Sequence, residues 1–518
     1  MPDRTSPAFP RPSGLPARSL AEAAARVAAA LPEGADPELA LSGVTLRSGD
    51  VRPGDLYAAL PGSAHHGAEF AAAAVEAGAV AVLTDPDGAA MLESVGVPVL
   101  VADSPRAVLG ELAAFVYGNP AEGLLLLGVT GTSGKTTTAY LLEAGLRAAG
   151  HTTGLIGTVE TRIGDEALAS TLTTPEAPDL QALFAVMRER GVTAVAMEVS
   201  SHALALGRVD GTVFDVAAFT NLGRDHLDFH PDLESYFLAK ASLFTPARAR
   251  AAVVTVDGEH GVRLVGLAAE AGLPVTTVTT GSGDAAWRAA DVEVGPEGSR
   301  LRALGPDEEC ELVVGLPGAY NVANGLLALA ALDAAGVPAK TAAPALAAVR
   351  VPGRMERVPD AGTGIVGVVD YAHKPDAVEA ALSAVRAAVA GRVLVVLGAG
   401  GDRDREKRPL MGEAAARRAD VLVVTDDNPR SERPGDIRSA VLAGARGVPL
   451  PRRAVVLELG DRRGAIRAAV GLARPGDAVV VLGKGHERGQ SAGGVVTPFD
   501  DRDELADALE ALASEAAE

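Results

Sequence analysis

Eight short apolar runs recur along the chain and constrain its fold more than any other feature. Within each run the hydrophobic residues follow one another without polar alternation, which is typical of strands buried on both faces of a parallel sheet. Helical stretches separate the runs, and this order indicates βαβ units. The sequence therefore predicts an α/β protein. The runs lie at residues 124–130, 192–200, 214–220, 251–257, 364–370, 392–398, 421–425 and 477–483.

Two Pro- and Gly-containing breaks divide the chain. They are "YGNPAEG" at 117–123 and "VRVPGRME" at 349–356. The 518 residues also correspond to about three domains of ~100–200 residues each. We therefore expect domains at 1–121, 122–352 and 353–518. The first 18 residues are rich in Pro and Ser and lack the apolar region of a signal peptide, so we expect a disordered tail there.

The charge balance restricts the partners of the chain. Lys and Arg number 47 against 67 Asp and Glu, which gives a net charge of −20. Such an acidic chain is a poor candidate for broad binding to nucleic acids or anionic membranes. No apolar run reaches the ~18 residues of a membrane span, and Cys310 is the single cysteine. We expect a cytoplasmic monomer that acts on small molecules.

Polar and unusual residues gather directly after the apolar runs. Examples are "NLGRDHLD" (221–228), "DYAHKP" (370–375), "DDNPR" (426–430) and "GKGHE" (483–487). In open α/β sheets, ligands bind beyond the carboxyl ends of the strands. These segments therefore predict a cleft lined by loops from more than one domain, as in a multi-domain enzyme.

The stretch "GVTGTSGKTTT" (128–138) resembles a phosphate-binding loop with displaced glycines. The general pattern G-x-x-x-x-G-K-[ST] requires glycine at position 129, where this chain has Val129. A strand precedes the loop and a helix follows it, so backbone N–H groups at the helix start favour phosphate. Lys135 adds a cation, and Thr136 can ligate Mg²⁺. The alternative is a glycine turn with an exposed lysine.

Three further polar groups stand out, and the residues alone do not fix their roles. Glu198 ends an apolar run, where a carboxylate needs either a basic partner or a metal ion. His226 lies between Asp225 and Asp228, as in a cluster of ligands. Lys240 lies on an expected helix, where a lysine usually faces solvent. From the residues alone these alternatives stay open.

Five motifs in order resemble those of the Mur ligase family. They are "GVTGTSGKTTT", "EVSSHAL" (198–204), "TNLGRDHLDFH" (220–230), "YFLAK" (236–240) and "GAYNVANGLLALAAL" (318–332). These ATP-dependent enzymes add amino acids to the UDP-linked peptidoglycan precursor. The resemblance covers nearly the whole chain. It implies an N-terminal domain for the UDP-linked precursor, a central P-loop-type parallel-sheet ATPase domain and a C-terminal Rossmann-like domain for the amino acid.

The resemblance also implies roles for particular residues around ATP. The catalytic set would be Lys135, Glu198, His226 and Lys240, the last as a carbamate. Ligands of Mg²⁺ would be Thr136, Glu198, His226 and carbamylated Lys240. Lys374 would close over ATP together with Arg354 and Asp370. The implied ATP-binding residues are Gly131, Thr132, Ser133, Gly134, Lys135, Thr136, Thr137, Asn321, Arg354 and Asp370.

Two more groups of residues follow from the branch of the family that adds the third amino acid. The segment "DNPR" resembles that of members that add 2,6-diaminopimelate, because the distal carboxylate of this amino acid suits the guanidinium of Arg430. The implied pocket is Arg403, Asp427, Asn428, Pro429, Arg430, Gly483 and Glu487. The implied precursor-binding residues are Leu46, Ser48, Thr173, Thr174, Ser200 and Arg208.

Two other functions remain as alternatives. A folylpolyglutamate synthetase-like ligase would share the central domain, but "DNPR" and the long N-terminal domain disfavour it. A nucleotide-binding switch protein would use only the phosphate loop. The guanine-reading motif N-K-x-D is absent, and such a protein has no use for His226 and Lys240.

Overall fold

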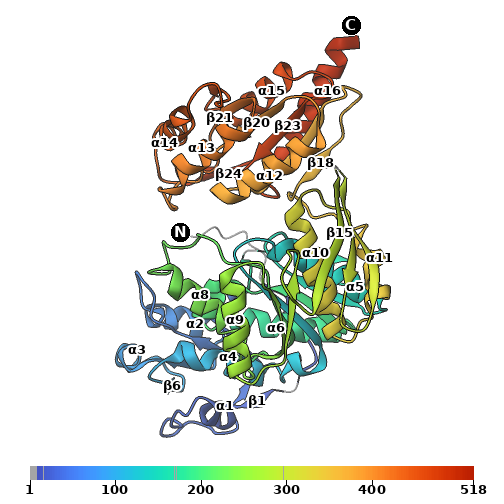
Figure 1. Cartoon of the computed structure of the whole chain (residues 1–518). Helices are drawn as coiled ribbons and strands as arrows, with labels where there is room; N and C mark the ends of the chain where they lie inside the picture. The colour runs from blue at the N-terminus through green and yellow to red at the C-terminus, as the bar shows by residue number, and fades with distance from the viewer. Residues whose placement is uncertain (1–8, 16, 169, 171, 296, 518) are drawn as a thin grey trace.

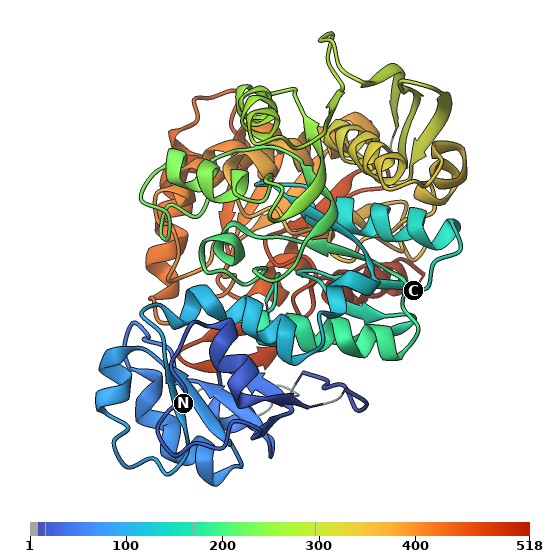
Figure 2. The same cartoon turned by 90° about the horizontal axis from the view of Figure 1, so that it is seen from below.

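The computed structural model describes residues 9–15, 17–168, 170, 172–295 and 297–517. Three main sheets follow one another along the chain (Figure 1). The N-terminal part, in blue, lies at the opposite end of the molecule from the orange and red C-terminal part, with the central part between them. In Figure 2 the N-terminal part again projects from one side of the other two.

The N-terminal part holds a parallel sheet in the order β3-β4-β5-β6. Ser19 caps the first helix, with its side chain accepting from the N–H of Glu22. The elements are β1 (Arg18–Ser19), α1 (Leu20–Arg26), β2 (Ala40–Leu41), β3 (Gly43–Thr45), η1 (Ser48–Asp50), β4 (Asp55–Ala58), η2 (Gly67–Phe70), α2 (Ala71–Glu76), β5 (Ala81–Thr84), α3 (Pro86–Ala90), β6 (Val99–Val101), α4 (Pro105–Val116) and η3 (Pro120–Gly123).

The central part is built on an 11-stranded sheet in the order β10-β9-β8-β11-β7-β12-β13-β14-β15-β16-β17. The elements are β7 (Leu125–Thr130), α5 (Lys135–Ala148), β8 (Thr153–Ile156), β9 (Thr161–Ile163), β10 (Glu166–Leu168), α6 (Ala177–Glu189), β11 (Ala194–Glu198), α7 (Ser201–Ala205), β12 (Phe214–Phe219), α8 (Leu233–Ala241), β13 (Ala249–Thr255), α9 (Glu259–Glu270), β14 (Val275–Thr279), β15 (Trp287–Gly295), β16 (Gly298–Leu304), β17 (Glu309–Val314), α10 (Ala319–Ala334) and α11 (Ala339–Leu346).

The strands from β8 to β15 in this order run parallel, and both ends of the sheet are antiparallel. Side chains of β7 alternate between two cores, as a pleated strand requires. Leu127 and Val129 face the core that includes α5, α10 and α11, whereas Leu126 faces the core that includes α6 and α9. Helices on both faces bury the sheet, which is why its strands read as continuous apolar runs.

The C-terminal part has a six-stranded sheet in the order β18-β19-β23-β20-β21-β22, parallel except for β18. The elements are β18 (Glu356–Val358), β19 (Val366–Asp370), α12 (Pro375–Ala388), β20 (Val393–Leu397), α13 (Lys407–Arg418), β21 (Val421–Val424), α14 (Pro434–Gly447), β22 (Val455–Glu458), α15 (Arg462–Leu472), β23 (Ala478–Leu482), β24 (Gly489–Ala492), β25 (Val495–Pro498) and α16 (Asp501–Ala517).

The eight apolar runs all form strands, so the predicted α/β class is confirmed. They correspond to β7, β11, β12, β13, β19, β20, β21 and β23. The three main sheets fall within the three predicted domains, and we retain the boundaries near residues 121 and 352 as a proposal.

The prediction of a disordered tail does not hold for its described residues. Arg11 forms an ion pair with Asp55 at 3.4 Å and contacts the hydroxyl of Tyr117. The N–H groups of Ser13 and Gly14 donate to the carboxylate of Glu189 in α6. These charged partners order a segment whose composition alone indicates disorder. Residues 1–8 and 16 of the predicted tail lie outside the described residues.

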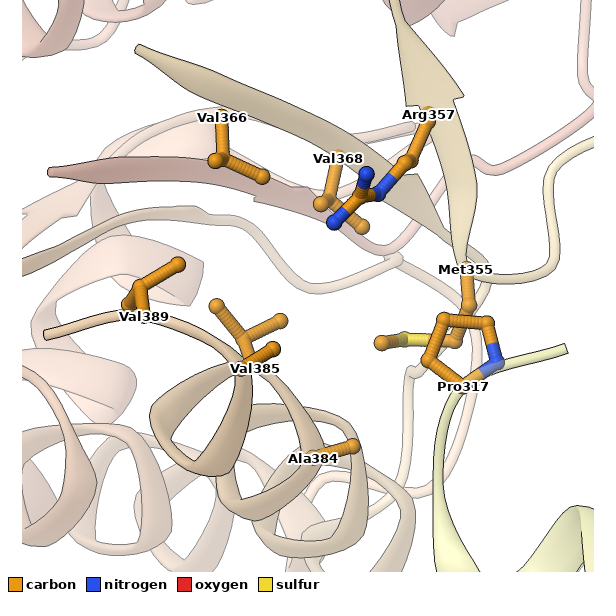
Figure 3. Close-up of a pocket in the computed structure, with 9 residues that line it drawn as sticks. Pro317, Met355, Arg357, Val366, Val368, Ala384, Val385 and Val389 are labelled. Atoms are coloured by element: carbon orange, nitrogen blue, oxygen red, sulfur yellow. The ribbon is translucent and has the colours of Figure 1, made fainter. Parts of the chain in front are cut away.

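The junction between the central and C-terminal parts contains a small apolar pocket (Figure 3). Pro317, just before α10, lies there close to Met355 and opposite Ala384 of α12. Arg357 is the one charged residue among its lining, so the pocket lacks the convergent polar groups of a ligand site. We interpret it as a packing gap at the junction of the two parts.

Candidate active site

The loop that resembles a phosphate-binding loop joins β7 to α5. Its backbone geometry explains why residues 131 and 134 are glycines. Gly131 has φ +147°, and a Cβ there would lie 1.8 Å from the hydroxyl of Thr220. Gly134 has φ +90° at the N-terminus of α5, and a Cβ would lie 2.3 Å from the amide oxygen of Asn324. Val129 instead belongs to the buried strand. The usual first glycine is therefore replaced where the chain is still inside the sheet.

The loop is fastened to the segment after β12 and leaves a set of N–H groups free. The N–H of Thr132 donates to the carbonyl of Asn221 at 2.9 Å, and the N–H of Ser133 donates to its side chain at 3.0 Å. Within the described ranges, the N–H groups of residues 134–137 have no acceptor. Four free donors at a helix N-terminus form a site for an anion.

Three lysines meet around this loop. The ammonium of Lys135 donates to the carbonyl of Gly131 at 2.9 Å, and that of Lys240 donates to the same oxygen at 2.8 Å. Lys374, from the C-terminal part, reaches the carbonyl of Thr132 at 3.4 Å. Burial, reinforced by the charge of Lys374, lowers the pKa of Lys135 to about 8. Such a concentration of cations suits a polyanionic ligand.

Glu198 is the last residue of β11 and lies beside the phosphate loop. Its side chain is only 1% exposed and has no basic partner among the described residues. Instead, its carboxylate accepts from the hydroxyl of Thr136 at 3.0 Å and from the N–H of Thr158 at 2.7 Å. Of the two interpretations of Glu198, this geometry favours a carboxylate reserved for a metal ion over one paired to a base.

His226 and Lys240 both lie near the Tyr236 ring. The ring centroid of Tyr236 is 6.1 Å from that of His226 and 4.3 Å from the Lys240 ammonium. Burial lowers the pKa of His226 to about 3, so the imidazole is neutral. Lys240 is 1% exposed, and burial with the nearby Lys135 and Lys374 holds its pKa well below the usual range. Lys240 is thus not the solvated residue that its helix position alone suggests.

The C-terminal part reaches this site through two basic side chains. Lys374 pairs with Asp225 at 2.6 Å, and although burial raises the pKa of this carboxyl, the Lys374 ammonium holds it well below the usual range. The guanidinium of Arg354 stacks 4.2 Å from the Tyr371 ring and lies 3.5 Å from the Thr136 hydroxyl. Both contacts place groups of the two parts around one loop.

Asp370 and Asn321 support this arrangement from behind. The Asp370 carboxylate accepts from the N–H groups of Met355 and Ala372, at 2.7 and 2.8 Å, and so orders the segment that carries Arg354. Asn321 accepts from the side chain of Asn324 at 3.0 Å. Within the described residues, Asn321 makes no hydrogen bond to the loop; Asn324 is the residue that approaches Gly134.

A second polar cluster lies at the carboxyl ends of β21 and β23. The side chain of Asn428 donates to Glu487 at 2.7 Å, and Asp427 lies beside Gly483, where a Cβ would meet its carboxylate at 2.5 Å. Arg430 follows Pro429 and has φ +52°, and its guanidinium donates to the carbonyl of Gly401 at 2.5 Å. The predicted pocket residues Asp427, Asn428, Gly483 and Glu487 therefore form one cluster, with Arg430 at its side.

Arg403, Leu46 and Ser48 are not joined to the other predicted site residues. Arg403 is exposed and donates only to the neighbouring carbonyl of Asp402 at 3.1 Å. Leu46 packs at the edge of the N-terminal core, and Ser48 begins η1. Their predicted roles require a ligand to connect them with the rest of the site.

Four predicted precursor-binding residues lie together beside Glu198. The hydroxyl of Thr174 donates to the Glu198 carbonyl at 2.9 Å and accepts from the N–H of Ser200 at 3.1 Å. Arg208 donates to the Thr174 carbonyl at 3.3 Å, and Thr173 contacts the hydroxyl of Thr158 at 3.0 Å. They continue the phosphate-loop site toward the N-terminal part.

Several residues of the site were not singled out by their sequence. Thr158 has no motif around it, and Tyr236 and Asn221 lie inside quoted motifs without an assigned role. Lys484 lies inside "GKGHE", where its complete burial was not apparent. Among the residues described, no group of three His, Cys, Asp or Glu side chains could hold a metal ion by itself, and no helix is both long and apolar enough to cross a membrane.

Comparisons with known proteins also divide the chain into three successive parts. Family models match the Mur ligase family catalytic domain at residues 40–117, the Mur ligase middle domain at 129–332 and the Mur ligase glutamate ligase domain at 353–485. The chain is 57% identical over 509 residues to the UDP-N-acetylmuramoyl-L-alanyl-D-glutamate–2,6-diaminopimelate ligase of Streptomyces avermitilis, covering 98% of this chain and 99% of the relative.

Two more relatives carry the same name. The Streptomyces coelicolor protein is 56% identical over 508 residues, with 98% of this chain and 99% of the relative covered. A solved structure of a UDP-N-acetylmuramoyl-L-alanyl-D-glutamate–2,6-diaminopimelate ligase superposes with a TM-score of 0.69 at 30% identity, over 96% of this chain and 99% of that one.

Proposed function

Because the chain belongs to the Mur ligase family, we propose that it is the ATP-dependent ligase that adds 2,6-diaminopimelate to UDP-N-acetylmuramoyl-L-alanyl-D-glutamate. The observation that carries this proposal is the pair of sites on facing parts of the chain. One is the set of free N–H groups and lysines around the phosphate loop. The other is the cluster of Asp427, Asn428, Glu487 and Arg430. The names of the relatives support the same reaction.

The reaction needs two transfers. The γ-phosphoryl group of ATP passes to the side-chain carboxylate of D-glutamate, which releases ADP and gives an acyl phosphate. The amine of diaminopimelate then attacks the acyl carbon, phosphate leaves, and the nitrogen loses a proton. Lys135 and the N–H groups of residues 134–137 would hold the phosphates and stabilise the charge that develops on them.

Lys374 and Arg354 would add cations from the opposite side. Lys374 is anchored by Asp225, and Arg354 by the Tyr371 ring, so both are held in position before a ligand arrives. This prior ordering lowers the cost of reorganisation during the reaction.

The residues present fit Mg²⁺. Thr136 and Glu198 offer two hard oxygen donors in mutual contact, and Mg²⁺ in nucleotide sites commonly uses few protein ligands together with phosphates and water. The neutral imidazole of His226 and a carbamate on Lys240 would hold a second ion. When bound, Mg²⁺ would neutralise charge on the transferring phosphoryl group.

Lys240 has the properties that carbamylation requires. A neutral amine attacks CO₂ and forms a carbamate with loss of a proton, whereas an ammonium cannot. Burial and two neighbouring lysines favour the neutral amine of Lys240. The carbamate would bring a negative charge between these cations, so the modification would relieve their repulsion.

The amino-acid pocket would recognise diaminopimelate by its far end. The guanidinium of Arg430 would bind the distal carboxylate, in exchange for its present contact with Gly401. Glu487 would accept from the distal ammonium, and Asp427, Asn428 and Gly483 would shape the pocket. Arg403, which is exposed, would join on binding. Lysine lacks the distal carboxylate and would leave Arg430 without its ligand.

The alternatives explain less. A folylpolyglutamate synthetase-like ligase has no use for the N-terminal match at 40–117, nor for the pocket around Arg430. A switch protein has no use for a buried Lys240 whose pKa is held well below the usual range. We further propose a cytoplasmic monomer, because ATP is a cytoplasmic substrate and one chain supplies every residue of both sites.

The test is the substrate dependence of ATP turnover. ADP release should require the UDP-muramoyl dipeptide and diaminopimelate together, and a new amide should form for each ADP. Turnover with the dipeptide omitted, or with folate substrates in its place, would contradict the proposal. Light scattering of the purified 52.3-kDa chain tests the monomer.

A further inference from the structure

Lys484 is a buried cation that the proposed reaction does not use. It follows Gly483 directly after β23, and its side chain is 0% exposed. Its ammonium donates to the amide oxygen of Asn428 at 3.0 Å and lies 3.3 Å from a carboxylate oxygen of Glu487. A buried charge is costly unless it is paired and hydrogen-bonded. Both partners of Lys484 belong to the proposed amino-acid pocket.

The contacts of Asn428 fix which way its amide faces. Its oxygen accepts from Lys484 and, at 2.9 Å, from the N–H of Ser491 in β24. Its nitrogen therefore points to Glu487 and donates at 2.7 Å. If the amide turned over, its nitrogen would face two donors. Lys484 and the N–H of Ser491 together hold the Asn428 amide so that its nitrogen, rather than its oxygen, faces Glu487.

The charge of Glu487 depends on the same cation. Burial and the neighbouring Asp427 raise the pKa of Glu487, while Lys484 opposes them. Arg462 and Tyr371, on adjacent elements, also lie within electrostatic range of Glu487. Without Lys484, the balance would shift toward a protonated Glu487, which cannot accept from a substrate ammonium as a carboxylate does.

We propose that Lys484 is a positioning residue for the amino-acid pocket. It orients the Asn428 amide and keeps Glu487 anionic, and it acts through these two side chains without touching the substrate. This inference rests on the proposed diaminopimelate ligase activity and names a residue beyond the ones that contact the amino acid.

The test compares Lys484→Met with the wild type in steady-state kinetics. The KM for diaminopimelate should rise about 10- to 100-fold, the range expected for losing hydrogen bonds to a charged group. The KM values for ATP and the UDP-dipeptide should stay within about twofold. The acid limb of kcat/KM for diaminopimelate should move to higher pH, because Glu487 would protonate more readily.

A double-mutant cycle separates positioning from a general loss of structure. In a Glu487→Gln background, Lys484→Met should raise the KM for diaminopimelate by much less than in the wild type, because the residue through which it acts is already changed. The matched control is Arg392→Met, which breaks the ion pair with the buried Asp477 at the opposite end of the same sheet. It should lower thermal stability and leave the KM for diaminopimelate unchanged.

Distinct results would overturn the inference and the proposed function. If wild type used diaminopimelate and Lys484→Met kept its KM and pH profile, or if the cycle were additive, Lys484 would be only structural. If wild type did not use diaminopimelate, the proposed function itself would fail. Should Lys484→Met not fold, Lys484→Gln keeps an N–H donor without the charge, and its acid limb must still move to higher pH.

Discussion

The phosphate loop and the amino-acid pocket use polar groups in opposite ways. Around the loop, three lysines crowd two carbonyl oxygens, and the N–H groups of residues 134–137 have no acceptor in the described chain. In the pocket, Asn428, Lys484 and Glu487 already satisfy one another, and Arg430 donates to Gly401. The loop therefore has N–H donors that an anion can satisfy. In the pocket, a ligand must replace hydrogen bonds that the side chains already make with one another.

This difference indicates that the loop provides affinity for ATP and that the pocket provides selectivity for the amino acid. The N–H groups of residues 134–137 have no acceptor in the described chain to give up, so ATP can bind them with little reorganisation. A ligand of the pocket has to offer groups that replace each contact it breaks. An amino acid without a distal carboxylate leaves Arg430 on Gly401 and gains nothing from it, which gives discrimination.

Removal of Lys135 should have the largest effect and should be confined to the loop. Lys135→Ala should lower kcat by at least about 100-fold, because a charge that stabilises the transferring phosphoryl group is lost. The KM for diaminopimelate should change little. Rapid-quench measurement of acyl-phosphate formation checks this, with the exposed Lys340→Ala as control. If Lys135→Ala lowered only the affinity for diaminopimelate, the assignment of Lys135 to phosphoryl transfer, and with it the difference between the two regions, would be wrong.

Lys240 should behave as a modified residue of the same region. Lys240→Ala should reduce kcat by about 100-fold, and short carboxylic acids should restore part of it by supplying the missing anion. Degassed, bicarbonate-free wild type should lose activity and regain it when bicarbonate is added. Mass spectrometry of the intact chain under CO₂ gives the expected added mass. An active enzyme with unmodified Lys240 would contradict this prediction.

Arg430 tests the pocket by its effect on one substrate. Arg430→Ala should raise the KM for diaminopimelate about 30-fold or more, since loss of one partner of a desolvated pair costs ~2–5 kcal/mol. The KM values for ATP and the UDP-dipeptide should hold. Arg430→Lys should rescue poorly, because an ammonium lacks the planar fork.

The competing explanation for Arg430 is a purely structural one. Its backbone pairs with Ser491 and Gly493, so the side chain could serve only to cap this loop. In that case stability would fall and all three KM values would drift together. A diaminopimelate KM within about twofold of wild type would remove the selectivity assignment.

The pH dependence of ATP binding should show a smaller effect. With no ligand, Lys135 has a pKa near 8, below its usual 10.5 because of burial and the nearby Lys374. Bound phosphates would raise this pKa, so binding above pH 8 takes up a proton and affinity should fall by up to about tenfold per pH unit. Calorimetry at pH 9 in buffers of different ionisation enthalpy should detect this uptake. No proton uptake would mean that Lys135 stays charged in the free enzyme.

The lowered pKa of Lys135 affects the stability of the ligand-free protein in the opposite direction: stability rises with pH, whereas ATP affinity falls. Since the folded state holds Lys135 with a lowered pKa, the unfolded chain binds more protons between pH 8 and 10.5. This group therefore destabilises the ligand-free protein at neutral pH, and its penalty diminishes as pH rises through that window. ATP would remove the same penalty at neutral pH.

The two regions also differ in how far the sequence predicts them. The loop could be predicted because strand β7, the glycines and α5 are adjacent in the chain, although the side chains that exclude a Cβ at Gly131 and Gly134 come from remote segments. The contacts that fasten the loop could not be predicted, since Asn221 lies far from it in sequence. The buried state of Lys240 and Lys484 likewise depends on packing between remote segments.

The same limit applies to the fold. The eight apolar runs mark buried parallel strands, but the short parallel strands β5 and β8, also buried, were not identified. Strands β16 and β17, which pair antiparallel, carry exposed charges on alternate positions and were not identified either. The described tail residues near Arg11 were misjudged because composition does not reveal Asp55 or Glu189 as partners.

Product analysis in a competition tests the central claim most directly. Wild-type enzyme, ATP and the UDP-muramoyl dipeptide are incubated with equal concentrations of diaminopimelate and lysine, and the products are separated by mass. We predict that the diaminopimelate tripeptide dominates, and that Arg430→Ala narrows the ratio between the two products. Equal amounts of both tripeptides from the wild type, or ADP release with no tripeptide, would contradict the account.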